Sequence, residues 1–248
     1  MTLRLAVWSG PRNISTAMMR AWENREDTAV VDEPFYAHYL LETHLEHPAA
    51  GEVMRRGELD WRKVVATLLG PAPGGRAIWY QKHMTHHMLP HIDRKFLSQL
   101  VNVFLIRDPR DVVASYAKSR PGARIEALDI GLPQEASLIE HVRRTTGATP
   151  IIIDTGDFLQ APEAHLRAWC ARIGVAFTDR MLHWPPGPRD TDGVWAPHWY
   201  DAVWKSTGFE PAHARDHHVA PEHAAVVDEA MPHYQALREQ RLVPQAVI

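Results

Sequence analysis

The chain has 248 residues, of which 45% are apolar and 23% charged, and its formal net charge is −3 at pH 7. These values are ordinary for one α/β domain, and they give no electrostatic reason to expect a nucleic acid partner. A single cysteine excludes an intramolecular disulfide and zinc bound by cysteine pairs. No apolar run approaches 18 residues, and the N-terminus lacks the pattern of a secretory signal. We therefore expect a cytoplasmic protein without a membrane segment.

Apolar runs and segments of helical periodicity alternate along the chain. The predicted strands are residues 3–8, 28–31, 77–80, 102–106 and 151–153. The predicted helices run from the first loop to about residue 24, over 40–69 with breaks near Pro48 and Gly51, from residue 108 onward, and over 135–146, 162–173 and 222–242. This alternation predicts a three-layer α/β/α fold with a mostly parallel central sheet, formed by residues 1–248 as one domain. Right-handed crossovers would bring the carboxyl ends of the strands to one edge, where ligands usually bind.

The stretch at residues 6–16, AVWSGPRNIST, predicts a strand, a tight loop and a helix start. The amides of the loop and of the first helical turn would converge on one point of partial positive charge, which suits a phosphate or sulfate group. Arg12 adds a full charge, and Ser15 and Thr16 add hydroxyl donors. An ordinary strand-to-helix turn, with glycine for the bend and serine as a cap, explains this stretch equally well by itself.

Other polar features follow the predicted strands. They are the pair at 32–33, the pair at 82–83, and Arg107 with Ser115. Ser115 lies four residues after Asp111, on the same face of the predicted helix, so Arg107 and Ser115 are placed to grip one phosphate from two sides. Taken alone, a surface arginine and a helix serine explain this pair as well. In that helix Asp108 is the expected cap and Pro109 the first residue.

Two later segments complete the prediction. Residues 184–211 hold four of the nine tryptophans and several prolines, which predicts a long loop anchored by aromatic rings. Such a loop either covers the ligand site or wraps the domain without touching it. Residues 222–242 form the predicted C-terminal helix, in which Pro232 marks a kink or a break.

The first loop differs from that of nucleoside triphosphate hydrolases. Their motif G-x-x-x-x-G-K-[ST] needs a lysine for the outer phosphates and a hydroxyl for Mg²⁺, whereas no lysine precedes Ser15 here. ATP-dependent phosphotransfer is therefore disfavoured. The histidine pairs at 86–87 and 217–218 have no acid at ligand spacing, so we expect no metal site.

Three segments resemble sulfotransferases that use 3′-phosphoadenosine 5′-phosphosulfate. Residues 11–16, PRNIST, are similar to the P-R-S-G-T-T type loop of that family. Residues 107–115, RDPRDVVAS, resemble its R-[ND]-P-[RK]-D-x-x-x-S signature, and residues 83–90 resemble the H-L-P-x-x-L-L-P segment that carries the general base. Residues 154–173 are similar to the strand, turn and helix that follow. The resemblance covers roughly residues 3–180.

The resemblance implies a cofactor, a reaction and a set of site residues. The cofactor would be 3′-phosphoadenosine 5′-phosphosulfate (PAPS), leaving as adenosine 3′,5′-bisphosphate (PAP). Its implied binding residues are Gly10, Pro11, Arg12, Asn13, Ile14, Ser15, Thr16, Arg107, Ser115 and Phe209. Arg12 and Lys82 would bind the sulfate and the leaving 5′-phosphate, while His83 or Glu33 would be the base for a hydroxyl or amine of a small acceptor. No metal, nucleic acid or membrane is implied, and the formation of a homo-oligomer stays open.

Two other functions stay open from the sequence. One is a P-loop phosphotransferase that uses a nucleotide with Mg²⁺. The other is a module that binds PAP without catalysis, because Ile14 stands where the family loop has a glycine.

Overall fold

A computed structural model describes residues 2–119, 122, 124–210 and 219–245. The His217–His218 pair and Pro211, the predicted end of the Trp-rich loop, lie outside the described residues. In the described part, five parallel strands form one sheet in the order β2-β3-β1-β4-β5. The strands are β1 Leu3–Ser9, β2 Thr28–Asp32, β3 Ile78–Met84, β4 Val101–Ile106 and β5 Ile151–Asp154. The predicted α/β fold with a parallel central sheet is confirmed.

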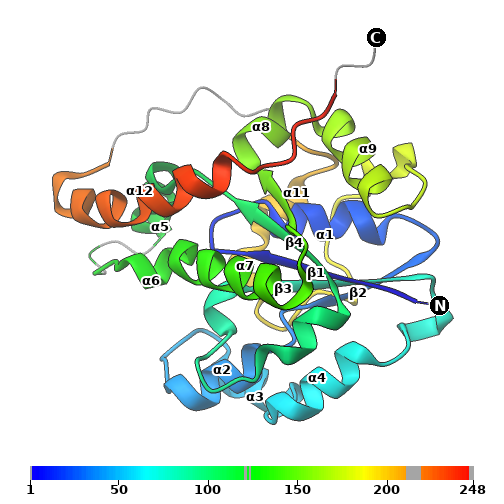
Figure 1. The fold of residues 1–248 in the computed structure, drawn as a ribbon. Coiled ribbons are helices and arrows are strands. Elements are labelled where there is room, and N and C mark those ends of the chain that lie inside the picture. The colour runs from blue at the N-terminus through cyan, green and yellow to red at the C-terminus, as the bar shows by residue number, and fades with distance from the viewer. Residues whose placement is uncertain (1, 120–121, 123, 211–218, 246–248) are drawn as a thin grey trace.

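Helices cover both faces of this sheet (Figure 1). The helices are α1 Ser15–Glu23, α2 Tyr36–Thr43, α3 Ala50–Arg56, α4 Trp61–Leu69, α5 Pro109–Ser119, α6 Ala127–Ile130, α7 Leu132–Thr146, α8 Thr155–Gln160, α9 Pro162–Arg172, α10 Ala196–Trp199, α11 Asp201–Lys205 and α12 Ala224–Arg238. The short 3₁₀ segments are η1 Pro73–Gly75, η2 Thr85–His87, η3 Arg94–Gln99, η4 Asp179–Met181 and η5 Pro221–His223. Of the helices that the structure describes, none is long and apolar enough to cross a membrane.

The side chains of β1 alternate between two hydrophobic cores. Leu5 and Val7 pack in the core under α1, α8 and α9, whereas Ala6 and Trp8 pack in the core under α4, α5, α7 and α12. Both faces of the strand are thus buried, which explains its nearly unbroken apolar sequence.

The strand β3 is longer than its apolar pattern predicts. Lys82 and His83 were predicted to follow the strand, and this is wrong, because both lie within it, beside Val7 and Trp8 of β1. The pairing of β3 with β1 and β2 on either side carries the strand through these polar residues. Tertiary pairing here overrides the local sequence signal.

Helix ends follow the predicted signals more closely. Asp108 accepts a hydrogen bond from the Arg110 amide at 2.9 Å, and α5 begins at Pro109. Gly147 ends α7 in the left-handed region, with a φ of 70°. Of the two outcomes predicted at Pro232, a kink or a break, the break is wrong, because α12 continues through this residue.

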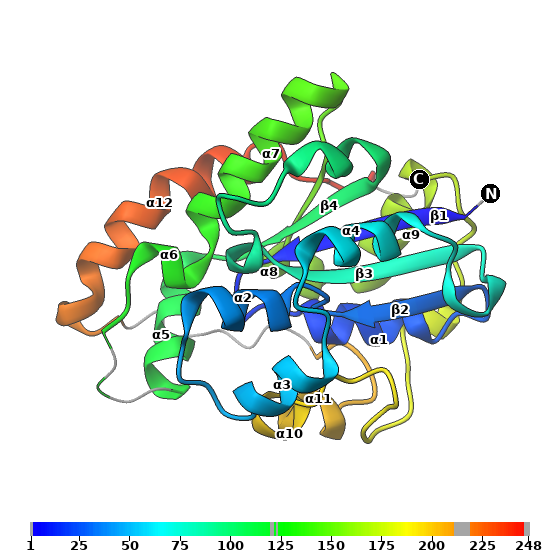
Figure 2. The ribbon, with the colours of Figure 1, turned by 90° about the horizontal axis from the view of Figure 1, so that it is seen from below.

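The Trp-rich segment contains more helix than expected. It forms α10 and α11, which lie beside α3 in Figure 2. Trp195 and Tyr200 pack there in a third hydrophobic cluster with Tyr36 and Leu40 of α2. These contacts bring the Trp-rich segment to the end of the sheet where β2 and β3 finish.

Candidate functional site

The first loop is shaped by close backbone contact. The amide of Gly10 donates a hydrogen bond to Glu135 Oε1 at 2.6 Å. A Cβ atom at position 10 would lie only 2.2 Å from the Ile130 carbonyl oxygen, so this position requires glycine. Burial raises the pKa of Glu135 well above its ordinary value, although the Gly10 amide opposes this. Arg12 turns the chain in the left-handed region, with a φ of 58°.

Asn13 ties the loop to the ends of β4 and β5. Its Nδ2 donates to the Leu105 carbonyl at 2.6 Å, and its Oδ1 accepts from the Ile14 amide at 2.8 Å and from Thr155 Oγ1 at 2.5 Å. Ser15 opens α1 directly after this anchor and is nearly buried. The amides of Gly10 and Ile14 are therefore already hydrogen-bonded inside the protein.

The predicted Arg107 and Ser115 pair touches the first loop. Arg12 Nε donates to Ser115 Oγ at 3.0 Å, and Arg107 Nη1 donates to the Arg12 carbonyl at 2.8 Å. Arg107 Nε lies 3.6 Å from the Asp111 carboxylate and makes no hydrogen bond within the described residues. Two segments about a hundred residues apart thus bring two guanidinium groups and a hydroxyl together, an arrangement that suits a doubly charged anion.

A buried ionic network lies at the ends of β2 and β3. Lys82 Nζ donates to Asp32 Oδ1 at 2.7 Å, to Glu33 Oε1 at 2.6 Å and to the Tyr200 hydroxyl at 2.8 Å. The Tyr200 hydroxyl in turn donates to Asp32 Oδ2 at 2.6 Å. We call Asp32, Glu33, Lys82 and Tyr200 the strand-end network.

The charges of this network shift its pKa values. Burial opposes the charged form of Lys82, yet the facing carboxylates of Asp32 and Glu33 raise its pKa well above the ordinary value. Burial also raises the pKa of Glu33, while the charge of Lys82 opposes that change. The Glu33 backbone has a φ of 44°, a conformation that costs free energy in a residue other than glycine.

His83 occupies the opposite face of β3. Its ring stacks on Trp8 with centroids 4.2 Å apart, and its side chain is almost fully buried. Burial, together with the nearby charge of Lys82, lowers the pKa of His83 to about 3. Its Nδ1 has no hydrogen-bond partner among the residues the structure describes. The imidazole is therefore neutral at physiological pH.

Rings gather next to the strand-end network. The ring of Tyr36 stacks on that of His87, with centroids 4.7 Å apart, and meets Trp195 edge-on at a centroid distance of 4.9 Å. The ring centroid of Tyr39 lies 4.6 Å from that of His87 and 5.3 Å from that of His86. These rings come from α2, η2 and the Trp-rich segment. We call Tyr36, Tyr39, His86, His87 and Trp195 the ring cluster.

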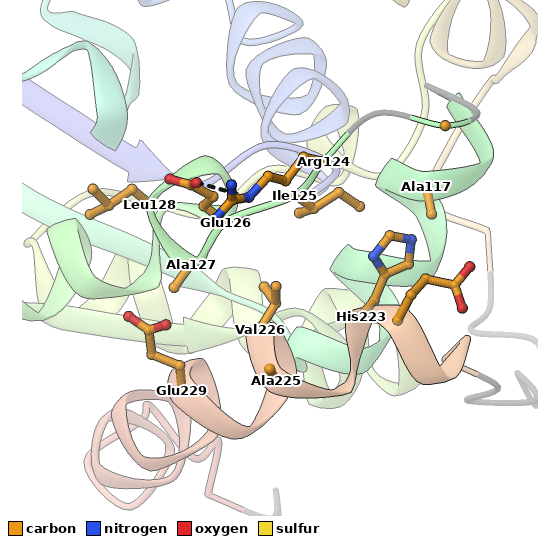
Figure 3. A pocket seen from close by; sticks show the side chains of 12 residues that line it. Ala117, Arg124, Ile125, Glu126, Ala127, Leu128, His223, Ala225, Val226 and Glu229 are labelled. Carbon is orange, nitrogen blue, oxygen red and sulfur yellow. Dashed lines mark ion pairs between the residues drawn. The ribbon is translucent and has the colours of Figure 1, made fainter.

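Two further observations place the remaining predicted features. Phe209 packs edge-on against Phe158 at 4.8 Å and Trp184 at 5.0 Å, as part of the core under α1. A cavity of about 670 Å³ lies between α5, residues 124–128 and α12 (Figure 3). None of the predicted site residues lines that cavity.

The sequence pointed to most of these residues but missed two. Tyr200 lies 118 positions from Lys82, and Glu135 lies 125 positions from Gly10. Both were hidden because no short motif links such distant positions. The only signal for Tyr200 was the aromatic composition of its segment, and the only signal for Glu135 was an acid at the start of a predicted helix.

Comparisons with known proteins agree with this architecture. A family profile described as "Sulfotransferase domain" matches residues 3–241. The fold is similar to a sulfotransferase from Alicyclobacillus acidocaldarius, with a TM-score of 0.59, 12% identity and 98% of each chain covered. It is also similar to the mouse sulfotransferase SULT7A1 complexed with PAP, with a TM-score of 0.55, 13% identity, and 96% of this chain and 89% of that chain covered.

A third solved structure is the sulfotransferase domain from the curacin biosynthetic pathway, with a TM-score of 0.57, 14% identity, and 93% of this chain and 98% of that chain covered. Among curated proteins, the chain is 32% identical over 231 residues to branched-chain-amino-acid aminotransferase-like protein 2 of Arabidopsis thaliana. That match covers 93% of this chain but 40% of the relative, and the like-named protein 1 matches at 33% identity, with 93% and 41% covered. The chain thus spans about two fifths of the length of these relatives.

Proposed function

The chain belongs to the sulfotransferase domain family, and we propose that it transfers the sulfuryl group of PAPS to a hydroxyl or amine of a small acceptor. The observation that carries this proposal is the contact of the first loop with Arg107 and Ser115. The mouse protein of similar fold is complexed with PAP, which supports a donor of this class.

The donor would be held at two points. Arg107 and Ser115 would bind its 3′-phosphate, since Arg107 Nε keeps hydrogen-bonding capacity within the described residues. Arg12 and the first turn of α1, beginning at Ser15, would bind the 5′-phosphosulfate. Because Gly10 has no Cβ atom, the loop lies close to residues 130–131, and this contact determines its path.

Sulfuryl transfer depends mainly on positioning and on stabilising charge at the oxygens of the transferred group. In the proposed reaction the acceptor oxygen or nitrogen forms a bond to sulfur while the bond from sulfur to the 5′-phosphate oxygen breaks, releasing PAP. Arg12 would stabilise the negative charge on the transferred group and on the leaving phosphate. Lys82, which keeps its proton, would orient the Glu33 carboxylate, to which its Nζ donates at 2.6 Å.

We propose that Glu33 is the general base that takes the proton from the acceptor hydroxyl or amine, and that His83 takes no proton and has a positioning role. Burial brings the pKa of Glu33 upward, toward the working pH, where a carboxylate is a better general base. His83, with a pKa of about 3, holds a transferred proton weakly at neutral pH. The ring cluster beside Glu33 would line the acceptor side, where flat aromatic faces bind apolar parts of a small molecule.

The test of donor binding is a calorimetric titration with PAP of the wild type and of Arg107→Ala. Hydrogen bonds to charged groups contribute about 1.5–3 kcal/mol each, so the substitution should weaken binding about 10- to 150-fold. Arg110→Ala is the matched control, because Arg110 pairs with Asp108, the residue that caps α5, and not with the first loop. It should change the affinity less than twofold. Absence of saturable binding to the wild type at high micromolar PAP would contradict the donor assignment.

A second measurement separates the alternatives. PAP release from PAPS, measured with a mixture of small alcohols and amines, should fall at least about 100-fold in Glu33→Gln while PAP affinity stays within a few fold. Tight PAP binding without any release in the wild type would indicate a non-catalytic binding module. Saturable binding of Mg²⁺–ATP that exceeds PAP binding would instead favour a phosphotransferase.

A further inference from the structure

Two histidines and a glutamate converge where α2 meets the segment that follows β3. His38 Nε2 lies 2.9 Å from His91 Nε2, and a carboxylate oxygen of Glu42 joins them so that all three atoms lie within 4.8 Å of one another. They line a cavity of about 340 Å³. The remaining residues that line it are Leu59, Asp60, Trp61 and Arg62.

The protonation of His38 is fixed by a backbone group. Its Nδ1 lies 2.8 Å from the Leu59 carbonyl oxygen, which only accepts hydrogen bonds, so Nδ1 carries the proton. Its Nε2 therefore presents a lone pair toward His91. A histidine that ligates a metal usually donates its other ring N–H to a carbonyl or carboxylate in this way, which orients the ring.

Two of the three ligands share a helical support. His38 and Glu42 are four residues apart on α2 and therefore share one face of that helix. His38 is buried, whereas Glu42 and His91 are exposed on the cavity wall. One anchored ligand and two accessible ligands describe a site that an ion reaches from solvent.

We propose that His38, Glu42 and His91 form a binding site for a divalent transition metal of the Zn²⁺ class. Two imidazoles and one carboxylate suit Zn²⁺, with bonds of about 2.0–2.2 Å, and water completes the coordination in the cavity. Tetrahedral ligation separates two such nitrogens by about 3.3 Å, so the exposed His91 ring moves by a few tenths of an ångström. Without metal, the His91 Nε2–H donates to His38 Nε2; with metal bound through Nε2, the neutral His91 ring would carry its proton on Nδ1 instead.

This site is separate from the proposed sulfuryl-transfer site. None of its three ligands belongs to the strand-end network, the first loop or the Arg107 and Ser115 pair. A bound ion would tie α2 to residues 88–93, and α2 begins at Tyr36 of the ring cluster. The ion would therefore hold these two segments together on the acceptor side of the protein. Its binding can be measured without PAP.

The test uses ZnCl₂ and CoCl₂ as probes on the untagged chain of 248 residues, after treatment with EDTA and dialysis. We expect one tightly held Zn²⁺ per chain, a higher unfolding midpoint with Zn²⁺, and Co²⁺ absorption bands of a nitrogen- and oxygen-ligated site. His91→Ala should weaken Zn²⁺ binding at least about 100-fold, and Glu42→Gln about 10- to 100-fold. His91 is exposed, so its substitution leaves the fold intact.

The control accounts for the other histidines, of which the chain has 16 in total. His198→Ala removes an exposed histidine of α10 that is not one of the three ligands, and Zn²⁺ affinity should stay within twofold. If His91→Ala retains the tight Zn²⁺ with unchanged Co²⁺ bands, the ion binds elsewhere and the proposal is overturned. Absence of any Zn²⁺ that resists dialysis also overturns it.

Discussion

Replacing Tyr200 with phenylalanine removes the hydroxyl by which this residue of the Trp-rich segment contacts Asp32 and Lys82. The ring keeps its volume, so no cavity forms, and only the hydroxyl group is lost. That hydroxyl donates to Asp32 Oδ2 at 2.6 Å and accepts from Lys82 Nζ at 2.8 Å and from Trp195 Nε1 at 3.3 Å. Burial raises the pKa of Tyr200 well above its ordinary value, so the hydroxyl is a neutral donor between two charged groups.

The magnitude follows from the two hydrogen bonds to charged groups, since the one from Trp195 is longer and neutral. Each bond to a charged group contributes about 1.5–3 kcal/mol, and Asp32 and Lys82 keep each other as partners after the change. We therefore expect Tyr200→Phe to lower the free energy of unfolding by about 3 kcal/mol.

A matched control lies in the same protein. Tyr80 is fully buried, and its hydroxyl has no hydrogen-bond partner within the described residues. Tyr80→Phe removes the same atom without breaking a bond, so we expect a change between zero and about 1 kcal/mol of stabilisation. Urea unfolding, followed by tryptophan fluorescence and circular dichroism, measures both variants.

The comparison refutes the reasoning if Tyr200→Phe and Tyr80→Phe differ by less than about 1 kcal/mol. The hydroxyl would then not stabilise the strand-end network. A double-mutant cycle with Asp32→Asn supplies the coupling energy between Asp32 and Tyr200, and we expect at least about 1 kcal/mol.

The remaining predictions concern the first loop and two buried titrating groups. The pKa of His83 is about 3 in the fold against 6.5 in its ordinary state, so unfolded chains bind the extra proton and stability falls as the pH drops from 6.5 toward 3. His83→Gln should reduce the loss between pH 7 and pH 5 by about 2 kcal/mol in urea titrations, and an unchanged loss would contradict the assignment. The pKa of Glu135 is raised, so its contribution is complete below the ordinary value of 4.5 and is lost as the pH rises. The thermal midpoint of Glu135→Gln relative to that of the wild type should therefore rise as the pH goes from 4.5 to 7. A difference that stays constant over this range would show that this group does not titrate as stated. Gly10→Ala places a Cβ atom 2.2 Å from the Ile130 carbonyl oxygen, so it should destabilise the chain by about 1–3 kcal/mol and weaken PAP binding at least tenfold. In the control Gly51→Ala, in α3, the new Cβ atom meets no atom within 4 Å, so the change should be neutral or stabilising. Equal effects of the two substitutions would refute the role of close contact.

Local sequence patterns determined much of the architecture. The apolar run at residues 102–106 predicted β4 within one residue, because both faces of a central parallel strand are buried and need apolar side chains. The sequence at 108–111 predicted the start of α5, because the cap and the proline act within a single turn. The motifs at 11–16 and 107–115 also indicated the family, which the profile match later showed.

Tertiary structure alone decided which polar groups meet. Lys82 was predicted at a strand end, as a charge near the sulfate, but the structure places it inside β3 between two carboxylates and a tyrosine. No local motif pointed to Tyr200 as a partner of Lys82, because a hydrogen bond between residues 118 positions apart leaves no local periodicity.

The same reasoning applies to the titrating groups. His83 carries an ordinary imidazole in the sequence, and only its burial against Trp8 makes it a neutral ring with a low pKa. The kinds of chemical groups and the order of the elements could thus be predicted from the sequence, because these depend on neighbours within a few residues. The fold decided the partners, the burial and hence the charge of each group, because these depend on contacts that form only when distant segments pack together.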